Sequence, residues 1–212
     1  MKSLLDCRLY SFIDTSYLHG RDPLDIACQL CDGGSDIIQI RCKRSTPEQI
    51  QRLAEQILPV TSRYGVHLVI NDYPAIALRI GADTCHLGQE DFFEAGFTLA
   101  TQVTGCPAKI KLGLSTHAPE QAQRAISAGP DYIAIGPVFA TGTKPTAAPV
   151  TLDYVRWAAV NVTIPWFAIG GINLQNIDEV LAAGAHRICI VSAILNAPDV
   201  AKACSQFRER LG

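Results

Sequence analysis

The sequence lacks several features that would indicate a membrane or a nucleic acid as partner. No segment is apolar for the roughly 18 residues that a membrane helix needs, and the N-terminal stretch MKSLLDCRLYSFIDTSYLHG has no signal-peptide core or cleavage site. Charged residues make up only 18% of the chain, the formal net charge is −2, and the basic residues are dispersed. The composition therefore predicts a cytoplasmic protein that binds neither membrane nor nucleic acid and favours a small, neutral-to-anionic ligand.

The sequence also has few signs of a cysteine-based site. Its eight cysteines are scattered, and Cys7, Cys85 and Cys189 lie within apolar runs typical of strands. Cys28 and Cys31 form one C-x-x-C, but no second pair has metal spacing, and the surrounding pattern is that of a helix interior. We therefore expect reduced, packed thiols rather than a disulfide framework, a redox centre or a zinc site.

The stretch IGPVFATGTKP, residues 135–145, lacks the pattern of a nucleotide-binding P-loop. In that pattern a glycine is followed directly by lysine, whereas here Thr143 separates Gly142 from Lys144. The glycines, threonines and lysine still offer close backbone approach, hydroxyl donors and a positive charge. The stretch therefore predicts either an anion-binding loop or an ordinary surface turn, and only its place in the fold can decide.

Four glycine-led segments indicate a repeated organisation of strands and helices. They are GGSDIIQI, GADTCHLG, GPDYIAIG and GAHRICIV, and the first three begin 48 residues apart, at Gly33, Gly81 and Gly129. Helical patterns such as PEQAQRAISAG precede them, and the glycine ends the helix. Further apolar runs occur at RLYSFI, HLVIND, IKLGLST and IPWFAIGG, as expected for parallel strands covered on both faces. The chain thus has eight predicted strands.

Eight strands alternating with helices predict an α/β protein, a (β/α)8 TIM barrel that forms one domain over residues 1–212. The barrel would be short, which short loops would explain. The alternative is an open doubly wound sheet, but that fold usually has a glycine-rich dinucleotide-binding turn after the first strand. The segment SFIDTSYLHG has none.

Polar residues at the C-terminal ends of the strands are the candidates for an active site, because barrel enzymes build theirs at this rim. After the second strand Gln39, Arg41 and Lys43 alternate, so they share one side of an extended segment, and the two cations can clamp an oxyanion. The alternative interpretation is that Arg41 and Lys43 are ordinary solvent-exposed charges. Asn71 and Asp72 follow the third strand, and the fourth is followed by His86, Gln89, Glu90 and Asp91.

The carboxylates beside this basic clamp predict a bound cation. Like charges in one pocket repel unless a proton, a cation or a paired base intervenes. Mg²⁺ prefers one or two carboxylates together with phosphate oxygens and water, a set that Asp72, Asp91 and a bound diphosphate would supply. The alternative is that Asp72 and Asp91 form salt bridges with Arg41 or Lys43.

The remaining strand ends predict a second phosphate subsite. Ser115, Thr116 and His117 end the fifth strand, and the sixth is followed by Thr141, Thr143 and Lys144. The ends of the seventh and eighth strands, where barrels often bind phosphate through backbone N–H groups, carry Gly170, Gly171, Val191 and Ser192. One subsite would thus be cationic and metal-assisted, and the other built from amides and hydroxyls.

Taken together, these motifs resemble those of the thiamine phosphate synthase family over essentially the whole chain. The matching stretches are QIRCK, IND, HLGQED, GLSTH, GPVFATGTK, AIGGI and VSAI, in the family's order. The resemblance implies that a pyrimidine diphosphate and a thiazole phosphate condense to thiamine phosphate and pyrophosphate. It implies a pyrimidine diphosphate site of Gln39, Arg41, Lys43, Asn71, Ser115 and Lys144, Mg²⁺ at Asp72 and Asp91, and a thiazole phosphate site of Thr141, Thr143, Gly171, Val191 and Ser192.

Under this resemblance Arg41, Lys43 and Lys144 would be the catalytic cations, which neutralise the charge that grows on pyrophosphate. Three places depart from the family's usual pattern. Cys42 stands where an acidic residue is common, the Thr84–Cys85 pair where a glycine is frequent, and Thr151 where the loop before the sixth helix often has glycine. Thr151 is the most consequential of these because it restricts the backbone near the phosphate loop.

Two other functions stay open at this point. A thiazole tautomerase of the related TenI type would use the same barrel, with His117 as an acid or base, and would need neither a metal nor a pyrimidine diphosphate site. A non-catalytic barrel that binds a phosphorylated metabolite is the other, since fold alone never excludes it. A homo-oligomer is also left open, because one sequence does not show whether a helix face is an interface.

Overall fold

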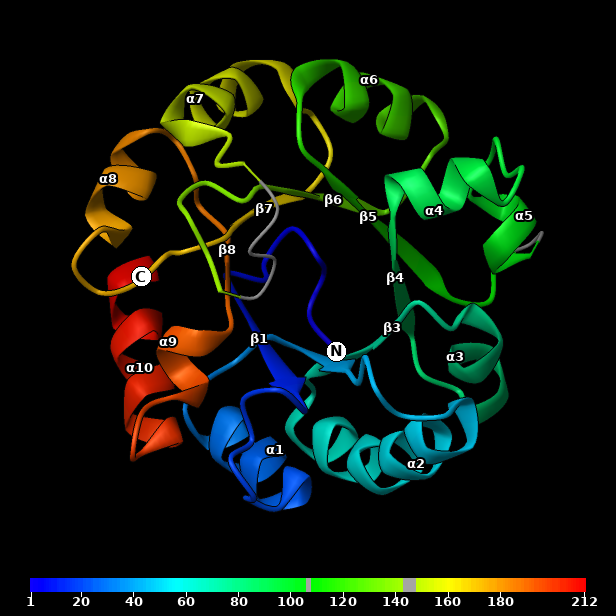
Figure 1. The fold of residues 1–212 in the computed structure, drawn as a ribbon, viewed down its shortest axis with the longest axis vertical. Helices are drawn as coiled ribbons and strands as arrows, with labels where there is room; N and C mark the ends of the chain where they lie inside the picture. Colours follow the sequence, from blue (N-terminus) through cyan, green and yellow to red (C-terminus); the bar gives the residue numbers. More distant parts are fainter. Residues whose placement is uncertain (106–107, 143–147) are drawn as a thin grey trace.

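The protein is a closed barrel of eight parallel strands. The computed structural model describes residues 1–105, 108–142 and 148–212. Strands β1 to β8 pair in chain order, and β8 pairs with β1 to close the barrel. Figure 1 shows the helices as a ring around the strands. The predicted (β/α)8 fold is confirmed.

All eight predicted strands are present. They are β1 (Leu9–Asp14), β2 (Ile37–Arg41), β3 (His67–Asn71), β4 (Thr84–Gly88), β5 (Lys111–Thr116), β6 (Tyr132–Ile135), β7 (Trp166–Ile169) and β8 (Ile188–Ile190). The helices are α1 (Pro23–Asp32), α2 (Pro47–Tyr64), α3 (Pro74–Ile80), α4 (Gln89–Glu94), α5 (Thr101–Thr104), α6 (Pro119–Ser127), α7 (Thr151–Asn161), α8 (Ile177–Ala182), α9 (Ser192–Leu195) and α10 (Val200–Leu211). Two helices follow β4, and two follow β8.

Local sequence signals set the helix ends. Asp22 caps α1 by accepting from the backbone N–H of Leu24, and Thr46 with Gln49 forms a capping box at the start of α2. Gly65 ends α2 in the left-handed conformation at φ 69°, which glycine adopts without a Cβ penalty. In the part of the chain with described positions, no helix is both long and apolar enough to cross a membrane.

The cysteines with described positions are free thiols, and all of them except the half-buried Cys28 are buried. The seven that fall in the described ranges are all free, and Cys106 lies outside those ranges. Cys28 and Cys31 lie on α1, where Cys31 is buried. Burial raises the pKa of Cys31 to about 12, so it stays protonated near neutral pH. The C-x-x-C therefore contributes packing to the helix.

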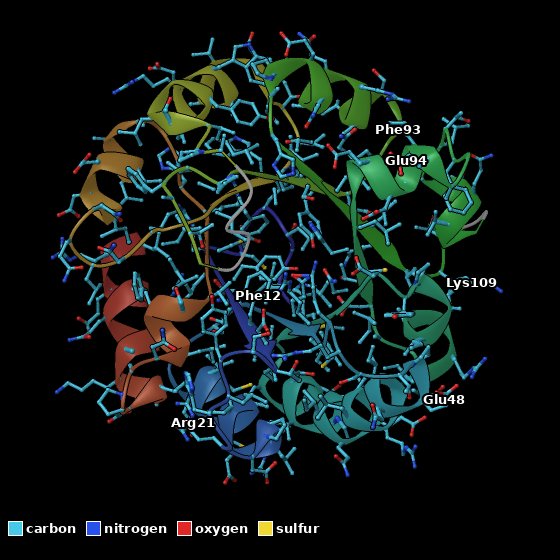
Figure 2. All side chains as sticks on the ribbon, in the orientation of Figure 1. Phe12, Arg21, Glu48, Phe93, Glu94 and Lys109 are labelled. Atoms are coloured by element: carbon cyan, nitrogen blue, oxygen red, sulfur yellow. The ribbon has the colours of Figure 1, made fainter. Side chains whose placement is uncertain are left out.

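Aromatic side chains fill the inside of the barrel. Tyr10, Tyr132 and Phe167 pack edge to face, with ring centroids 5.4 to 6.1 Å apart. Gly113 on β5 makes room for Tyr132, because a Cβ at this glycine would lie 2.0 Å from Cζ of the tyrosine ring. Figure 2 shows Phe12 of β1 within the ring of helices, whereas Glu48 of α2 lies at its outer edge.

A network of charged and polar groups connects the N-terminal segment of the chain to the end of the barrel where the strands begin. The buried Asp36 carboxylate accepts from Lys2 Nζ at 2.5 Å and from the backbone N–H groups of Arg8 and Leu9 at 2.7 and 3.1 Å. His67, also buried, contacts the Lys2 carbonyl through Nε2 at 2.8 Å. These bonds fix the N-terminal ends of the strands, at the end of the barrel opposite to the C-terminal rim.

Candidate active site

A pocket opens at the C-terminal ends of the strands, and residues from all eight strands line it. Every predicted site residue with a described position lies in this lining: Gln39, Arg41, Lys43, Asn71, Asp72, Asp91, Ser115, Thr141, Gly171, Val191 and Ser192. Thr143 and Lys144 lie outside the described residues. Side chains far apart in the sequence therefore meet in one cavity, as expected for the rim of a barrel.

The strand register explains which of these residues are neighbours. β1 and β2 are aligned so that Asp14 lies beside Arg41. β3 and β4 place Asn71 beside His86, and β4 and β5 place Gly88 beside Ser115. Each of these strands thus ends next to a residue of the following strand that lines the same pocket.

Arg41 is held by a buried ion pair. Its Nη1 lies 2.5 Å from Oδ2 of Asp14, and Asp14 is fully buried while Arg41 is 9% exposed. Asp14 Oδ1 accepts from the backbone N–H of Ser16 at 2.9 Å. Sequence reasoning named salt bridges from Asp72 and Asp91 as the possible partners of Arg41 and missed Asp14. The alternation of Tyr10, Phe12 and Asp14 indicates that Asp14 faces the barrel interior, but its pairing with Arg41 follows only from the register of β1 and β2.

Lys43, Asp72 and Asp91 are exposed at the mouth of the pocket. Asp72 directly follows β3 with a left-handed backbone, φ 67°. Asp91 lies in the first turn of α4 and folds back over Gly88, so that a Cβ at Gly88 would lie 2.6 Å from Asp91 Oδ2. The absence of a side chain at Gly88 therefore leaves this carboxylate space beside the pocket.

Asp72 and Asp91 are the carboxylates in the pocket lining, and a metal ion held there would need further ligands from outside the protein. Among the described residues there is no group of three or more His, Cys, Asp or Glu side chains able to hold a metal. Mg²⁺ usually takes one or two carboxylates and completes its shell with substrate oxygens and water. Asp72 and Asp91 line the pocket and are of the ligand type that such an arrangement uses, so they are the residues that would hold the ion.

The opposite wall is made of backbone that approaches closely. Val138 N donates to the Ile169 carbonyl at 2.8 Å, and Phe139 N donates to the Gly170 carbonyl at 3.0 Å. Gly171 has φ 65°, and a Cβ there would lie 2.6 Å from the Ala140 oxygen. Only glycine fits this position without displacing the loop after β6. Val191 and Ser192 complete this wall at the start of α9.

A hydrogen-bonded chain of side chains crosses the barrel interior next to the pocket. Gln39 Nε2 donates to Asn71 Oδ1 at 2.8 Å, and the Tyr10 hydroxyl donates to Gln39 Oε1 at 3.2 Å. The hydroxyls of Tyr10 and Tyr132 are 3.0 Å apart, and the Tyr132 hydroxyl lies 3.1 Å from His86 Nδ1. The sequence indicated the rim position of His86 but gave no sign of the two tyrosines, which have the pattern of ordinary core residues.

His117 also lines the pocket, at the end of β5. Its Nδ1 contacts the Gly136 carbonyl, and its backbone N–H donates to Gln121 Oε1 at 2.7 Å. Because a carbonyl only accepts, the imidazole carries a proton at Nδ1. The ring is therefore fixed in orientation beside the loop after β6.

The three departures from the family pattern differ in their structural effect. Cys42 is buried, and burial together with the negative charge of Asp14 raises its pKa to about 11, so a neutral thiol stands there. Thr84 is buried, and its Oγ1 has no hydrogen-bond partner in the part of the chain described. Thr151 adopts φ 62°, the left-handed region that L-residues rarely occupy. The expected restriction at Thr151 is thus a real backbone feature.

Comparison with known proteins identifies the family. The family model described as thiamine monophosphate synthase matches residues 9–194, which is most of the chain. The chain belongs to the thiamine monophosphate synthase family. A thiamine-phosphate synthase of Thermus thermophilus is 47% identical over 182 residues, 84% of each chain. That of Acidothermus cellulolyticus is 41% identical over 211 residues, 99% of this chain and 97% of the other.

Solved structures agree with this membership. A thiamine phosphate pyrophosphorylase from Pyrococcus furiosus superposes with a TM-score of 0.81 at 27% identity, over 97% of this chain and 95% of the other. A 3-hexulose-6-phosphate synthase superposes with a TM-score of 0.69 at 20% identity over 97% of this chain and 100% of the other, which shows the fold alone. The thiamine monophosphate synthase family thus accounts for both the sequence and the barrel, and this member is a transferase.

Proposed function

We propose that this family member joins the diphosphate of 4-amino-2-methyl-5-hydroxymethylpyrimidine to 4-methyl-5-(2-phosphooxyethyl)thiazole, giving thiamine phosphate and pyrophosphate. The observation that carries the proposal is the pocket itself, whose lining holds Arg41 at the end of β2 and Lys43 just after it, together with the glycines after β7. Two phosphorylated substrates need two anion sites within one cavity, and this arrangement offers them. The relatives named thiamine-phosphate synthase support the same reaction.

The first task of the site would be to bind and stabilise the leaving pyrophosphate. Arg41 and Lys43 lie in the pocket lining, and Asp14 orients the Arg41 guanidinium. The two cations would stabilise the negative charge that grows on the leaving pyrophosphate. Preorganised contacts of this kind are each worth about 3 kcal/mol of transition-state stabilisation. Mg²⁺ held by Asp72 and Asp91 would supply further positive charge to the diphosphate oxygens. Lys144 stays a predicted third cation in the segment that the structure does not describe.

The second task would be to hold the thiazole phosphate opposite the pyrimidine. Gly171, Thr141 and the start of α9 with Ser192 line that wall, and their backbone N–H and hydroxyl groups would be the donors to the phosphate. Glycine at position 171 lets the chain approach a phosphate closely. No covalent nucleophile is required, because the pyrimidine amino group stabilises the methylene cation once the diphosphate leaves. Exclusion of water from the pocket then protects the cation.

A thiazole tautomerase is the second candidate, and the fixed orientation of His117 in the pocket is the observation that favours it. Such an enzyme would need no pyrimidine diphosphate site. The presence of Arg41, Lys43, Asp72 and Asp91 in the same lining supports the synthase instead. The cytoplasmic location and the oligomeric state stay predictions.

The deciding experiment mixes the purified protein with both substrates, in Mg²⁺ or in EDTA, and follows thiamine phosphate by thiochrome fluorescence. We expect product in Mg²⁺ and none in EDTA. Asp91→Ala should raise the Mg²⁺ concentration for half-maximal rate by about tenfold or more. Glu90→Ala, a change of the adjacent exposed carboxylate outside the pocket lining, is the matched control and should leave it unchanged.

Folded protein that makes no product in Mg²⁺ would reject the synthase proposal. The same sample would then be assayed for thiazole tautomerisation and for binding of phosphorylated ligands. Product formed equally well in EDTA would leave the synthase reaction in place and reject the magnesium requirement.

A further inference from the structure

The hydrogen-bonded side chains inside the barrel form a continuous chain from β4 to β3. His86, Tyr132, Tyr10, Gln39 and Asn71 are joined in that order by contacts of 3.1, 3.0, 3.2 and 2.8 Å. Tyr132 is fully buried, Tyr10 is 1% exposed and Gln39 is 2% exposed. We refer to these five residues as the tyrosine chain. All of its members except Tyr132 also line the pocket.

The number of protons on the tyrosine chain determines which group donates and which accepts at each of its hydrogen bonds. Burial raises the pKa of both Tyr10 and Tyr132 well above the usual value, so each hydroxyl keeps its single proton. Gln39 Oε1 can only accept, so the Tyr10 hydroxyl donates its single proton to this oxygen. Tyr10 must therefore accept at its contact with Tyr132, which donates.

The same reasoning determines the protonation of His86. Tyr132 has already donated its proton to Tyr10, so at the 3.1 Å contact with His86 Nδ1 its oxygen must accept. Nδ1 therefore carries the proton, and in the neutral ring Nε2 is then the basic nitrogen. At the other end of the chain, Asn71 uses Oδ1 to accept from Gln39, which leaves the Asn71 amide nitrogen as a donor.

We propose that Tyr10 and Tyr132 are positioning residues, which fix the amide direction of Gln39 and the Nδ1-protonated tautomer of His86 for recognition of the aminopyrimidine substrate. The identity of that substrate rests on the proposed function, whereas the tautomer does not. An aminopyrimidine offers N–H donors and ring-nitrogen acceptors side by side. Reversal of the chain would therefore place donor against donor and acceptor against acceptor, which a buried site strongly disfavours.

The direct test is nitrogen-15 NMR of histidine-labelled protein at a pH where the imidazoles are neutral. His86→Gln assigns the resonances of this ring. We expect the wild-type spectrum to show the proton on Nδ1 of His86, and Tyr132→Phe to shift the tautomer equilibrium. A wild-type proton on Nε2, or a spectrum that Tyr132→Phe does not change, would overturn the proposal.

The kinetic test separates positioning from general loss of structure. Tyr132→Phe keeps the ring that packs over Gly113 and removes only the hydroxyl, so we expect KM for the pyrimidine diphosphate to rise about tenfold, the effect of roughly one hydrogen bond. KM for the thiazole phosphate should change little. Equal changes in both KM values, or no change in either, would contradict the proposed role.

The matched control is Tyr154→Phe. Tyr154 is also buried, and its hydroxyl lies 2.7 Å from Thr116 Oγ1, but it belongs neither to the tyrosine chain nor to the pocket lining. Thr116 keeps its hydrogen bond to the Ala134 carbonyl, so both KM values should stay near wild type.

A second variant covers the case in which Tyr132→Phe does not fold. Tyr10→Phe breaks the link to Gln39 and should raise the same KM, with the near-UV circular dichroism spectrum used to verify folding. Unchanged kinetics in a folded Tyr10→Phe protein would also contradict the proposal. If the wild type makes no product, the proposed function fails, while the NMR spectrum still decides the direction of the chain.

Discussion

Asp14 and Arg41 form a buried ion pair between the adjacent ends of β1 and β2, with Oδ2 and Nη1 2.5 Å apart. Removal of one member of a buried pair is strongly destabilising, because the other charge is left without compensation in a poorly solvated place. Asp14 also fixes the guanidinium at the wall of the pocket. Arg41 thus depends on Asp14 both for stability and for its orientation toward a ligand.

The first prediction concerns this pair. Asp14→Asn should lower the free energy of unfolding by about 3 kcal/mol and raise KM for the pyrimidine diphosphate. Urea unfolding and steady-state kinetics measure the two effects. Asp178→Asn is the control, because its ion pair with Arg210 is exposed and should contribute less than about 1 kcal/mol. Equal losses in the two variants would contradict the importance of burial.

The second prediction concerns the close approach at Gly171. Gly171→Ala should raise KM for the thiazole phosphate about tenfold, because the new Cβ would lie 2.6 Å from the Ala140 oxygen and displace the loop. Gly81→Ala is the matched control: Gly81 has a similar left-handed φ of 73°, with nothing within 4 Å of the added Cβ. It should lose about 1 kcal/mol of stability with no change in KM. An unchanged KM in Gly171→Ala would show that the wall accommodates a side chain.

The third prediction concerns the left-handed threonine. Thr151→Gly should raise the free energy of unfolding by about 0.5 to 1 kcal/mol, because glycine relieves the strain at φ 62°. The Thr151 Oγ1 accepts only a long 3.3 Å bond from the exposed Asp153 backbone, so its loss matters little. Thr101→Gly, an exposed threonine at the first position of α5, should instead be destabilising. A lower free energy of unfolding in Thr151→Gly would contradict the idea that the backbone at Thr151 is strained.

The fourth prediction concerns pH and Asp36. Burial alone would raise the pKa of this carboxyl, but hydrogen bonds from Lys2, Arg8 and Leu9 lower it below its usual value. A lowered folded pKa means that the stabilisation is fully present above the unfolded value of about 4 and is lost as pH falls through the folded value. Asp36→Asn should therefore cost about 2 kcal/mol at pH 7 and less at a pH of about 3.

Urea unfolding at the two pH values measures this difference. Asp153→Asn is the control, because Asp153 is highly exposed and its ion pair with Arg156 lies on the surface. Its effect should stay below about 1 kcal/mol at both pH values. A cost for Asp36→Asn that does not shrink at the lower pH would show that the carboxylate charge is not what stabilises the base of the barrel.

The strands and the rim could be predicted from the sequence because both leave a local signal. A buried parallel strand is a short apolar run, and the polar residue that follows it marks its C-terminal end. Asn71 and Ser115 were located in this way, and both lie in the pocket. The restricted backbone at Thr151 was also expected, and the structure gives it φ 62°.

The side chains that support the site could not be predicted, because their roles depend on the strand register. Tyr10 and Tyr132 are 122 positions apart and have the pattern of core aromatics, and only the closed barrel brings their hydroxyls together. Asp14 ends the first strand, but its partnership with Arg41 follows from the alignment of β1 and β2. The short α5 and α9, of four residues each, have too few positions for a periodic signal.

The fit between Gly113 and Tyr132 has a consequence for how the family varies. The tyrosine ring occupies the volume that a side chain on the neighbouring strand would need, with only 2.0 Å between Cζ and the position of a Cβ. Neither position can therefore change size alone without a steric clash or a void. We expect relatives that carry a larger residue at position 113 to carry a smaller one at position 132, so that the two positions covary during evolution.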